Sequence, residues 1–188
     1  MSRQTVFKGK LICSGRNPEL EAEKWLSQQY ISQSHIWLLG LGAGFHLDAL
    51  AYRFPKNEIS VVEYSEELAS HYELQFANVQ VICAKNWAEF SRSDGFKKFS
   101  LVASDKLNFY PAQQTNPEFY KEILLGLNAQ TVESFYTYSR LLNITWNALE
   151  QRVKSMQTFN IKEIDSAFDG QAANKTKKIF SVLKELVR

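Results

Sequence analysis

Residues 35–44 read HIWLLGLGAG, and this stretch decides the fold. Its first half is an uninterrupted apolar run, which is typical of a parallel strand covered on both faces. Its second half places glycine at Gly40, Gly42 and Gly44, a GxGxG spacing that favours a tight turn. Apolar residues at helical spacing follow over residues 45–54, so the sequence predicts a strand, a glycine turn and a helix in succession.

Strand and helix patterns alternate on both sides of this unit. Short apolar runs predict strands at residues 58–63, 79–83 and 99–104, beside the central strand at 35–39. Helical spacing and capping signals predict helices at residues 18–30, 45–54, 66–76, 87–92, 117–129 and 132–156, with a strand at 131–138 as the alternative to the start of the last one. Weaker patterns predict two short strands meeting at Gly9 within residues 5–13, a strand at 160–164, a turn at 169–170 and a basic terminal helix.

This alternation predicts an α/β fold, with a Rossmann-like, doubly wound and mostly parallel sheet in three layers. Asn17-Pro18-Glu19 and Asn116-Pro117-Glu118 mark two helix starts, because asparagine caps a helix, proline fits its first position and an acid suits its positive end. We expect one domain over residues 1–188, with a small β extension at 1–16, a core at 17–130 and a helical part at 131–188.

Composition supports a single globular domain. The chain has 188 residues, of which 45% are hydrophobic, enough to bury one core. The first residues lack the apolar run of a signal peptide, and no window approaches about 18 apolar residues, so we expect a cytoplasmic protein without a membrane partner. The net charge of +2 does not demand an anionic partner, and we expect no nucleic acid. Cys13 and Cys83 lack the spacing of a metal site, and no metal is expected.

The glycine turn provides half of a site for a small nucleotide-type ligand. Its bare backbone allows close approach, and the next helix offers free N–H groups and partial positive charge. Glu63, at the end of the next strand, can accept hydrogen bonds from both ribose hydroxyls. Tyr64 can lie against a base and His46 can face a phosphate. The expected ligand contacts are Gly40, Gly42, Ala43, Gly44, His46, Glu63 and Tyr64.

A structural interpretation of the same residues stays open. Glycines at a strand-to-helix turn also permit close packing, and an acid at a strand end also caps the next helix. His46 can be a packing residue. No catalytic residue is assigned; the candidates are Asp105 and Lys106, placed at the carboxyl edge of the expected fourth strand, where open α/β sheets carry functional side chains.

The order of apolar strand, GxGxG, helix, strand and acid resembles the class I S-adenosylmethionine-dependent methyltransferases over roughly residues 35–105. This resemblance implies S-adenosylmethionine as the cofactor, held by Gly40, Gly42, Gly44 and Glu63. If the chain is an enzyme, it is then a transferase.

A second resemblance covers more of the chain. Residues 14–23 (SGRNPELEAE), 39–47 (LGLGAGFHL), 61–63 (VVE) and 117–120 (PEFY) are similar to the region that leads into the catalytic domain of the motility accessory factor family. Members of that family are bacterial flagellin glycosyltransferases that use nucleotide-activated nonulosonic acids. A related archaeal branch transfers diphosphate to a pterin. The family's Gly-Ala-Gly-Pro-Ser-Leu type motif is missing, because residues 168–173 read FDGQAA. The resemblance thus implies a fold and a nucleotide pocket without the transferase site.

Three hypotheses follow. The leading one is a protein that binds a nucleotide or adenosine ligand, is related to the first portion of the motility accessory factors and acts beside a protein partner. The second is a small S-adenosylmethionine-dependent methyltransferase. The third is a non-catalytic interaction module that uses an aromatic or basic surface.

Overall fold

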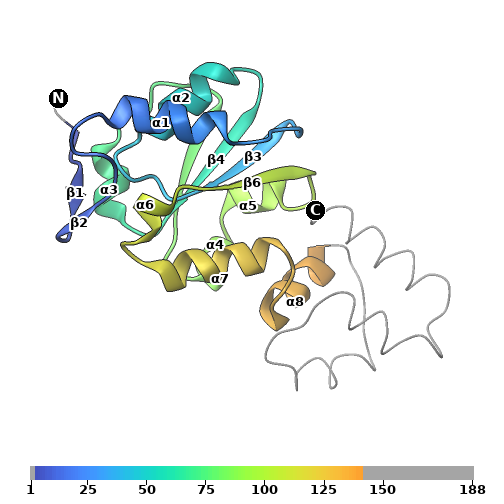
Figure 1. Cartoon of the computed structure of the whole chain (residues 1–188). Coiled ribbons are helices and arrows are strands. Elements are labelled where there is room, and N and C mark those ends of the chain that lie inside the picture. Colours follow the sequence, from blue (N-terminus) through green and yellow to red (C-terminus); the bar gives the residue numbers. More distant parts are fainter. Residues whose placement is uncertain (1–2, 142–188) are drawn as a thin grey trace.

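Four parallel strands form the central sheet of the computed structural model, which describes residues 3–141 (Figure 1). Their order across the sheet is β5-β4-β3-β6. Their bounds are His35–Leu39 for β3, Glu58–Glu63 for β4, Val79–Cys83 for β5 and Ser104–Asn108 for β6. The chain moves outward from β3 to β5 and then returns across β3 to β6. The topological switch point, where open α/β sheets hold ligands, therefore lies between β3 and β6.

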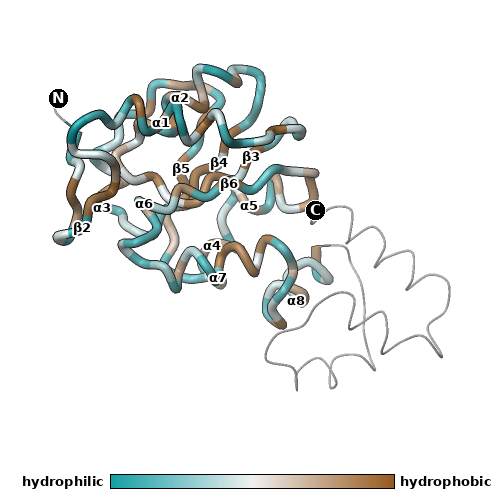
Figure 2. The backbone as a smooth tube through the Cα atoms, in the orientation of Figure 1, coloured by the Kyte–Doolittle hydropathy of each residue, from teal (hydrophilic) through white to brown (hydrophobic). Residues whose placement is uncertain are grey.

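Helices cover both faces of this sheet. On one face α1 (Pro18–Ser27) and α2 (Phe45–Arg53) form an apolar cluster with the strands. On the other face α4 (Trp87–Phe90), α5 (Asp94–Phe99), α7 (Pro117–Leu127) and α8 (Val132–Leu141) form a second cluster rich in aromatic rings. Hydrophobic residues accordingly gather along the strands (Figure 2). All five residues of β3 are buried, which confirms the prediction of a central strand covered on both faces.

Two short helices and a hairpin lie at the carboxyl end of the sheet (Figure 1). The helices are α3 (Glu66–His71) and α6 (Tyr110–Gln113). The hairpin pairs β1 (Val6–Phe7) with β2 (Lys10–Leu11) in antiparallel register. Its turn residues Lys8 and Gly9 both have positive φ, 48° and 74°, as a two-residue type I′ turn requires. Two short strands meeting at Gly9 were the sequence prediction, and they are present.

The predicted capping residues begin their helices. Asn17 Oδ1 accepts a hydrogen bond from the amide of Leu20 at 3.2 Å, and Asn116 Oδ1 accepts one from Phe119 at 3.4 Å. The helices that were predicted over residues 18–30 and 66–76 end earlier, at Ser27 and His71. No helix within residues 3–141 is long and apolar enough to cross a bilayer.

The predicted position of the fourth strand is wrong. The strand is not at residues 99–104 but at Ser104–Asn108, because Phe96 and Phe99 have helical spacing and pack in the core on α5. Ser93 begins that helix by accepting a hydrogen bond from the amide of Phe96. Further along, the alternative prediction of a strand at 131–138 is wrong, because Val132–Leu141 forms helix α8. The predicted elements at 160–164, 169–170 and the basic terminal helix, with the rest of helix 132–156, lie outside the described residues.

Gly126 is the contact point between α7 and α4, and replacing it with alanine should destabilise the fold. A Cβ atom at this position would overlap the indole ring of Trp87, which is itself buried. Alanine normally gains about 1 kcal/mol over glycine inside a helix. Here the overlap prevails, and we expect Gly126→Ala to lower the free energy of unfolding by about 2–3 kcal/mol in urea titrations. An unchanged or higher stability would show that the two helices separate freely.

Candidate functional site

The glycine turn after β3 is a left-handed bend at the carboxyl end of the central strand. Gly40, Gly42 and Gly44 have φ of 97°, 52° and 84°, a region that other residues adopt only with strain. Gly44 stands at the N-terminus of α2 and provides no side-chain cap there. The predicted succession of strand, glycine turn and helix is confirmed.

The protein's own groups pack against this bend. A Cβ atom on Gly42 would lie 2.8 Å from the carbonyl oxygen of Ile12, just after β2, and 3.2 Å from the Cβ of Ala112 on α6. A Cβ atom on Gly44 would lie 2.5 Å from the ring of Tyr72, just after α3. The glycines therefore permit close approach, and in this structure the groups that approach belong to the protein.

The carboxylate of Glu63 ends β4 and points at the bend. Its Oε2 accepts a hydrogen bond from the amide of Leu41, inside the glycine turn, at 2.9 Å. Its Oε1 accepts hydrogen bonds from the amides of Tyr64 and Ser65, at 2.9 and 3.0 Å. The side chain is fully buried, and burial raises the pKa of the carboxyl above its ordinary value although the three amides act in the opposite direction. Glu63 thus joins the glycine turn to the loop that begins α3.

Two tyrosine hydroxyls accompany this carboxylate. Burial and the charge of Glu63 raise the pKa of Tyr120 well above its ordinary value, although no hydrogen bond of regular geometry joins the two groups. The hydroxyl of Tyr64 is also buried and has no hydrogen-bond partner among residues 3–141. The Tyr64 ring packs at 6.1 Å from the ring of Phe119, and the Nζ of Lys8, on the hairpin, lies 5.5 Å from its centroid. Tyr64 therefore lies between the hairpin and the core.

His46 faces the interior on the other side of the bend. Its Nε2–H donates to the carbonyl oxygen of Gly40 at 2.9 Å. Its ring stacks on Phe109 at 3.7 Å and meets the edge of Trp25 at 5.5 Å. Burial lowers the pKa of His46 to about 4, so the ring is neutral at neutral pH. In this structure His46 braces the bend against the end of β6, as the packing interpretation of this residue expects.

Asp105 and Lys106 do not stand at the carboxyl edge of the sheet. Both lie inside β6, which begins at Ser104 rather than ending there. The Asp105 carboxylate accepts hydrogen bonds from the amides of Ser32 and Gln33, at 2.7 and 2.8 Å, in the loop that enters β3. Burial lowers the pKa of Lys106, and Asp105 acts in the opposite direction. The sequence-based placement of this pair at the edge is wrong, and its catalytic candidacy rested on that placement.

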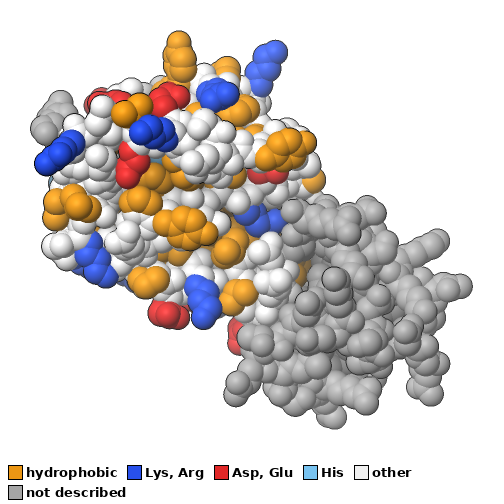
Figure 3. Space-filling view, in the orientation of Figure 1, with side chains coloured by type: hydrophobic (Ala, Val, Ile, Leu, Met, Phe, Trp, Pro, Cys, Tyr) orange, Lys and Arg blue, Asp and Glu red, His pale blue; other side chains and the backbone are white. Residues whose placement is uncertain are grey.

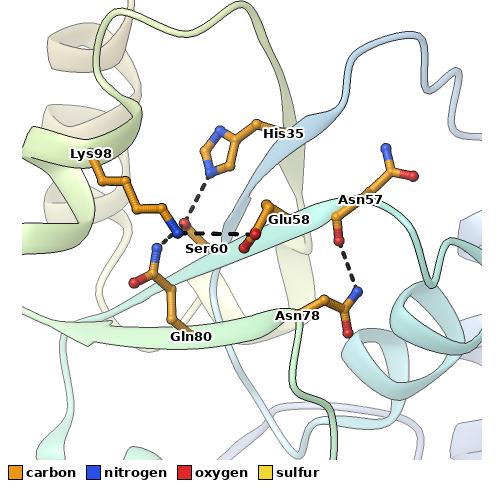
Figure 4. A network of polar contacts seen from close by, with 7 residues as sticks. All are labelled: His35, Asn57, Glu58, Ser60, Asn78, Gln80 and Lys98. Atoms are coloured by element: carbon orange, nitrogen blue, oxygen red, sulfur yellow. Dashed lines mark hydrogen bonds and ion pairs between the residues drawn. The ribbon is translucent and has the colours of Figure 1, made fainter.

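A buried polar network lies at the opposite, amino end of the sheet (Figure 4). The Nε2 of His35 and the Oγ of Ser60 share a hydrogen bond at 2.9 Å, and Gln80 Nε2 donates to the same oxygen at 2.7 Å. The Nδ1 of His35 is buried and has no partner within the described part of the chain. Burial, followed by the charges of Lys98 and Lys106, lowers the pKa of His35 to about 4. No sequence motif predicted this network, because its members come from three separate strands.

Two grooves flank the glycine bend. One, of about 440 Å³, lies beside the N-terminus of α2, where Arg3 forms an ion pair with Asp48 at 2.5 Å. The other, of about 450 Å³, passes Trp25 and Phe109 between α1 and the end of β6. Neither groove is lined by Glu63 or by the bend glycines. The structure therefore brings Glu63 onto the glycine turn, and Ile12, Ala112 and Tyr72 close that turn. It does not bring His46 and Tyr64 to the same place, because His46 packs on Phe109 and Tyr64 packs between the hairpin and the core.

Comparison of the chain with protein-family models, with curated proteins and with solved structures gives no match in any of the three. The fold and the bend define the class to which the structure belongs. It is an α/β protein with a four-stranded parallel sheet, in an arrangement consistent with a Rossmann-like fold.

Proposed function

We propose that this chain binds an adenosine- or nucleotide-type ligand at the bend after β3, with Glu63 as the acceptor for the ribose hydroxyls. The observation that carries the proposal is the 2.9 Å hydrogen bond from the amide of Leu41 to Glu63, because it brings an acid from β4 onto the glycine turn. A carboxylate in this position can accept from two adjacent hydroxyls. The kinship to the first portion of the motility accessory factors belongs to the same proposal.

The bend also supplies what a phosphate-bearing or charged ligand needs. Three residues of positive φ lead directly into α2, a helix of nine residues whose N-terminus has no side-chain cap. Its first amides and the helix dipole favour an anion there. Arg3, from the segment before β1, brings a guanidinium to the first turn of the same helix, where it forms an ion pair with Asp48.

Ligand binding at this place requires an exchange of hydrogen bonds. Glu63 now accepts three backbone amides, at Leu41, Tyr64 and Ser65. Ribose hydroxyls are donors, so they can replace amides at the carboxylate without changing its role as an acceptor. The amides that are released then become available to the ligand's own acceptors.

A thermal-shift panel with S-adenosylmethionine, S-adenosylhomocysteine, CMP and GTP tests the proposal. One of these ligands should raise the melting temperature by about 5–10 °C at a free concentration of about a hundred times Kd, since binding stabilises the native state by mass action. A selective response to S-adenosylhomocysteine would favour a methyltransferase, and a response to CMP would favour the glycosyltransferase kinship.

The variants Glu63→Gln and Glu66→Gln form a matched pair for this panel. Glu63 is buried at the bend, whereas the side chain of Glu66 is 73% exposed three residues further on. The ligand-induced shift should disappear in Glu63→Gln and persist in Glu66→Gln, each compared with its own ligand-free melting temperature. Equal shifts in both variants would place the ligand elsewhere.

An interaction module is the second candidate, favoured by one surface feature. A groove of about 600 Å³ lies between α4, α5 and α8. Among the described residues, Arg92, Lys97 and Arg140 line it together with one acid, Glu133. The face drawn in Figure 3 also carries separate hydrophobic patches among its charged side chains. If none of the four ligands raises the melting temperature, this candidate is favoured, with an acidic partner at the groove.

A further inference from the structure

The hairpin is the part of the structure that covers the proposed site. Phe7, Ile12 and Cys13 are buried together with Ala43, inside the bend, and Leu68 on α3. The carbonyl oxygen of Ile12 is also the group nearest to the bend at Gly42, because a Cβ atom added there would lie only 2.8 Å from it. The hairpin therefore occupies the space over the bend that a ligand would need.

The hairpin is attached by few contacts. Each strand has two residues, and an isolated two-stranded hairpin is marginally stable at best. Its buried cluster is distinct from the two large clusters on the faces of the sheet, and the partly buried Tyr64 packs against both this cluster and the aromatic one. The polar attachments lie near the surface and include the ion pair of Arg3 with Asp48 and the 2.6 Å hydrogen bond from Lys10 Nζ to the carbonyl of Gln114. Arg3 also lies over the rings of Phe45 and Tyr72. Segments with few buried contacts open more readily than the core.

One buried polar group beneath the hairpin lacks a hydrogen-bond partner within residues 3–141, whereas the neighbouring Glu63 accepts three amide hydrogen bonds. Glu63 is fully buried there, and the hydroxyl of Tyr64 is buried without a hydrogen-bond partner among the described residues. Lys8, in the hairpin turn, lies over the ring of Tyr64. Buried polar atoms without hydrogen-bond partners are uncommon in native structures. The unpaired hydroxyl therefore favours a position that other donors and acceptors reach when the hairpin is open.

We propose that residues 3–13 form a plug that opens as a unit, uncovering Glu63 and the glycine bend while the sheet stays folded. The role of this opening rests on the proposed function, because a ligand at the bend would bind the open form and compete with Ile12. Opening itself is a property of the protein alone and can be measured without any ligand.

Alkylation of Cys13 measures this opening. The chain has two cysteines, so a Cys83→Ala background leaves Cys13 as the only thiol, and Cys13 is 4% exposed in the hairpin cluster. N-ethylmaleimide then reacts when the hairpin opens, and mass spectrometry gives the rate. Gly9→Ala should raise this rate about tenfold, because φ of 74° strains an alanine, although its Cβ would meet no atom within 4 Å. Phe7→Ala, which removes a buried anchor, should act in the same direction.

Gly15→Ala is the matched control. Gly15 lies outside the hairpin and outside the left-handed region, and its nearest contact would be an ordinary 3.9 Å, so labelling should keep the background rate. In Gly9→Ala, the hydrogen-exchange rate of the Leu41 amide should rise together with the labelling rate of Cys13, while the amide of Val61 in β4 stays protected from exchange. The plug is wrong if Gly9→Ala leaves the labelling rate unchanged, or if Leu41 and Val61 exchange only together through global unfolding.

The ligand panel separates this proposal from the proposed function. S-adenosylhomocysteine, CMP or GTP should speed the labelling of Cys13 if it binds the open form. If the ligand slows this labelling instead, it does not compete with the hairpin, and that part of the proposal is wrong. Fast local opening without any ligand response would contradict the proposed function and leave the opening of the hairpin established.

Discussion

Acidification from pH 7 to pH 4 should remove about 6 kcal/mol of folding stability through two buried histidines. Burial lowers the pKa of both His35 and His46 from 6.5 to about 4. The native state therefore binds fewer protons than the unfolded state below pH 6.5, and stability is lost as the pH falls toward 4, by about 3 kcal/mol for each histidine. Glu63 opposes this loss above pH 4.5, because its raised pKa lets the native state keep a proton that the unfolded state releases.

Urea titrations at pH 7 and pH 5 isolate the contribution of each histidine. His46→Gln and His35→Gln should each reduce the difference in unfolding free energy between the two pH values by about 2 kcal/mol. The third histidine, His71, is exposed on α3, and His71→Gln serves as the control that keeps the wild-type difference. If all three variants show the wild-type difference, the acid sensitivity has another origin.

Replacing Glu63 with alanine should be the most damaging single change at the bend. The substitution leaves the amides of Leu41, Tyr64 and Ser65 without their acceptor, and two of these three hydrogen bonds are fully buried. An unpaired buried donor costs about 1–3 kcal/mol, so we expect a loss of about 4 kcal/mol or more in the free energy of unfolding. This cost outweighs any gain from removing a buried carboxyl, because the donors remain in place.

Two comparisons make this result specific. Glu63→Gln retains one oxygen acceptor and should fall between the wild type and Glu63→Ala. Glu66→Ala, at an exposed site where the carboxylate pairs with Lys85 at 3.6 Å, should cost less than about 1 kcal/mol. A cost for Glu63→Ala as small as that for Glu66→Ala would mean that the carboxylate does not hold the bend.

The sequence predicted the centre of the fold because hydrophobic periodicity and local caps decide it. The strands at residues 35–39, 58–63 and 79–83 agree residue for residue with β3, β4 and β5. The fourth strand was misplaced because β6 contains the charged residues Asp105 and Lys106. Asp105 pairs with the amides of Ser32 and Gln33, far away in the sequence, and no local pattern encodes such pairing. Tertiary contacts prevailed over the apolar run at 99–104.

The candidate site was predicted in part. The meeting of Glu63 with the glycine turn follows from the rule that the carboxyl ends of neighbouring parallel strands lie at one edge. The closure of the bend was not predictable, because Ile12 and Tyr72 reach it from segments whose position depends on packing rather than on local sequence. His46 turned inward for the same reason, since Trp25 and Phe109 come from distant parts of the chain.

An amide-detected NMR titration with the ligand that gives the largest thermal shift decides whether the bend binds it. Binding at the bend requires the amide resonances of Leu41, Gly42 and Tyr64 to move first and furthest, with those of Phe7 and Ile12 following as the hairpin is displaced. Shifts confined to the groove beside Arg92, Lys97 and Arg140, or an unmoved Leu41 amide at saturating ligand, would contradict a nucleotide site at Glu63.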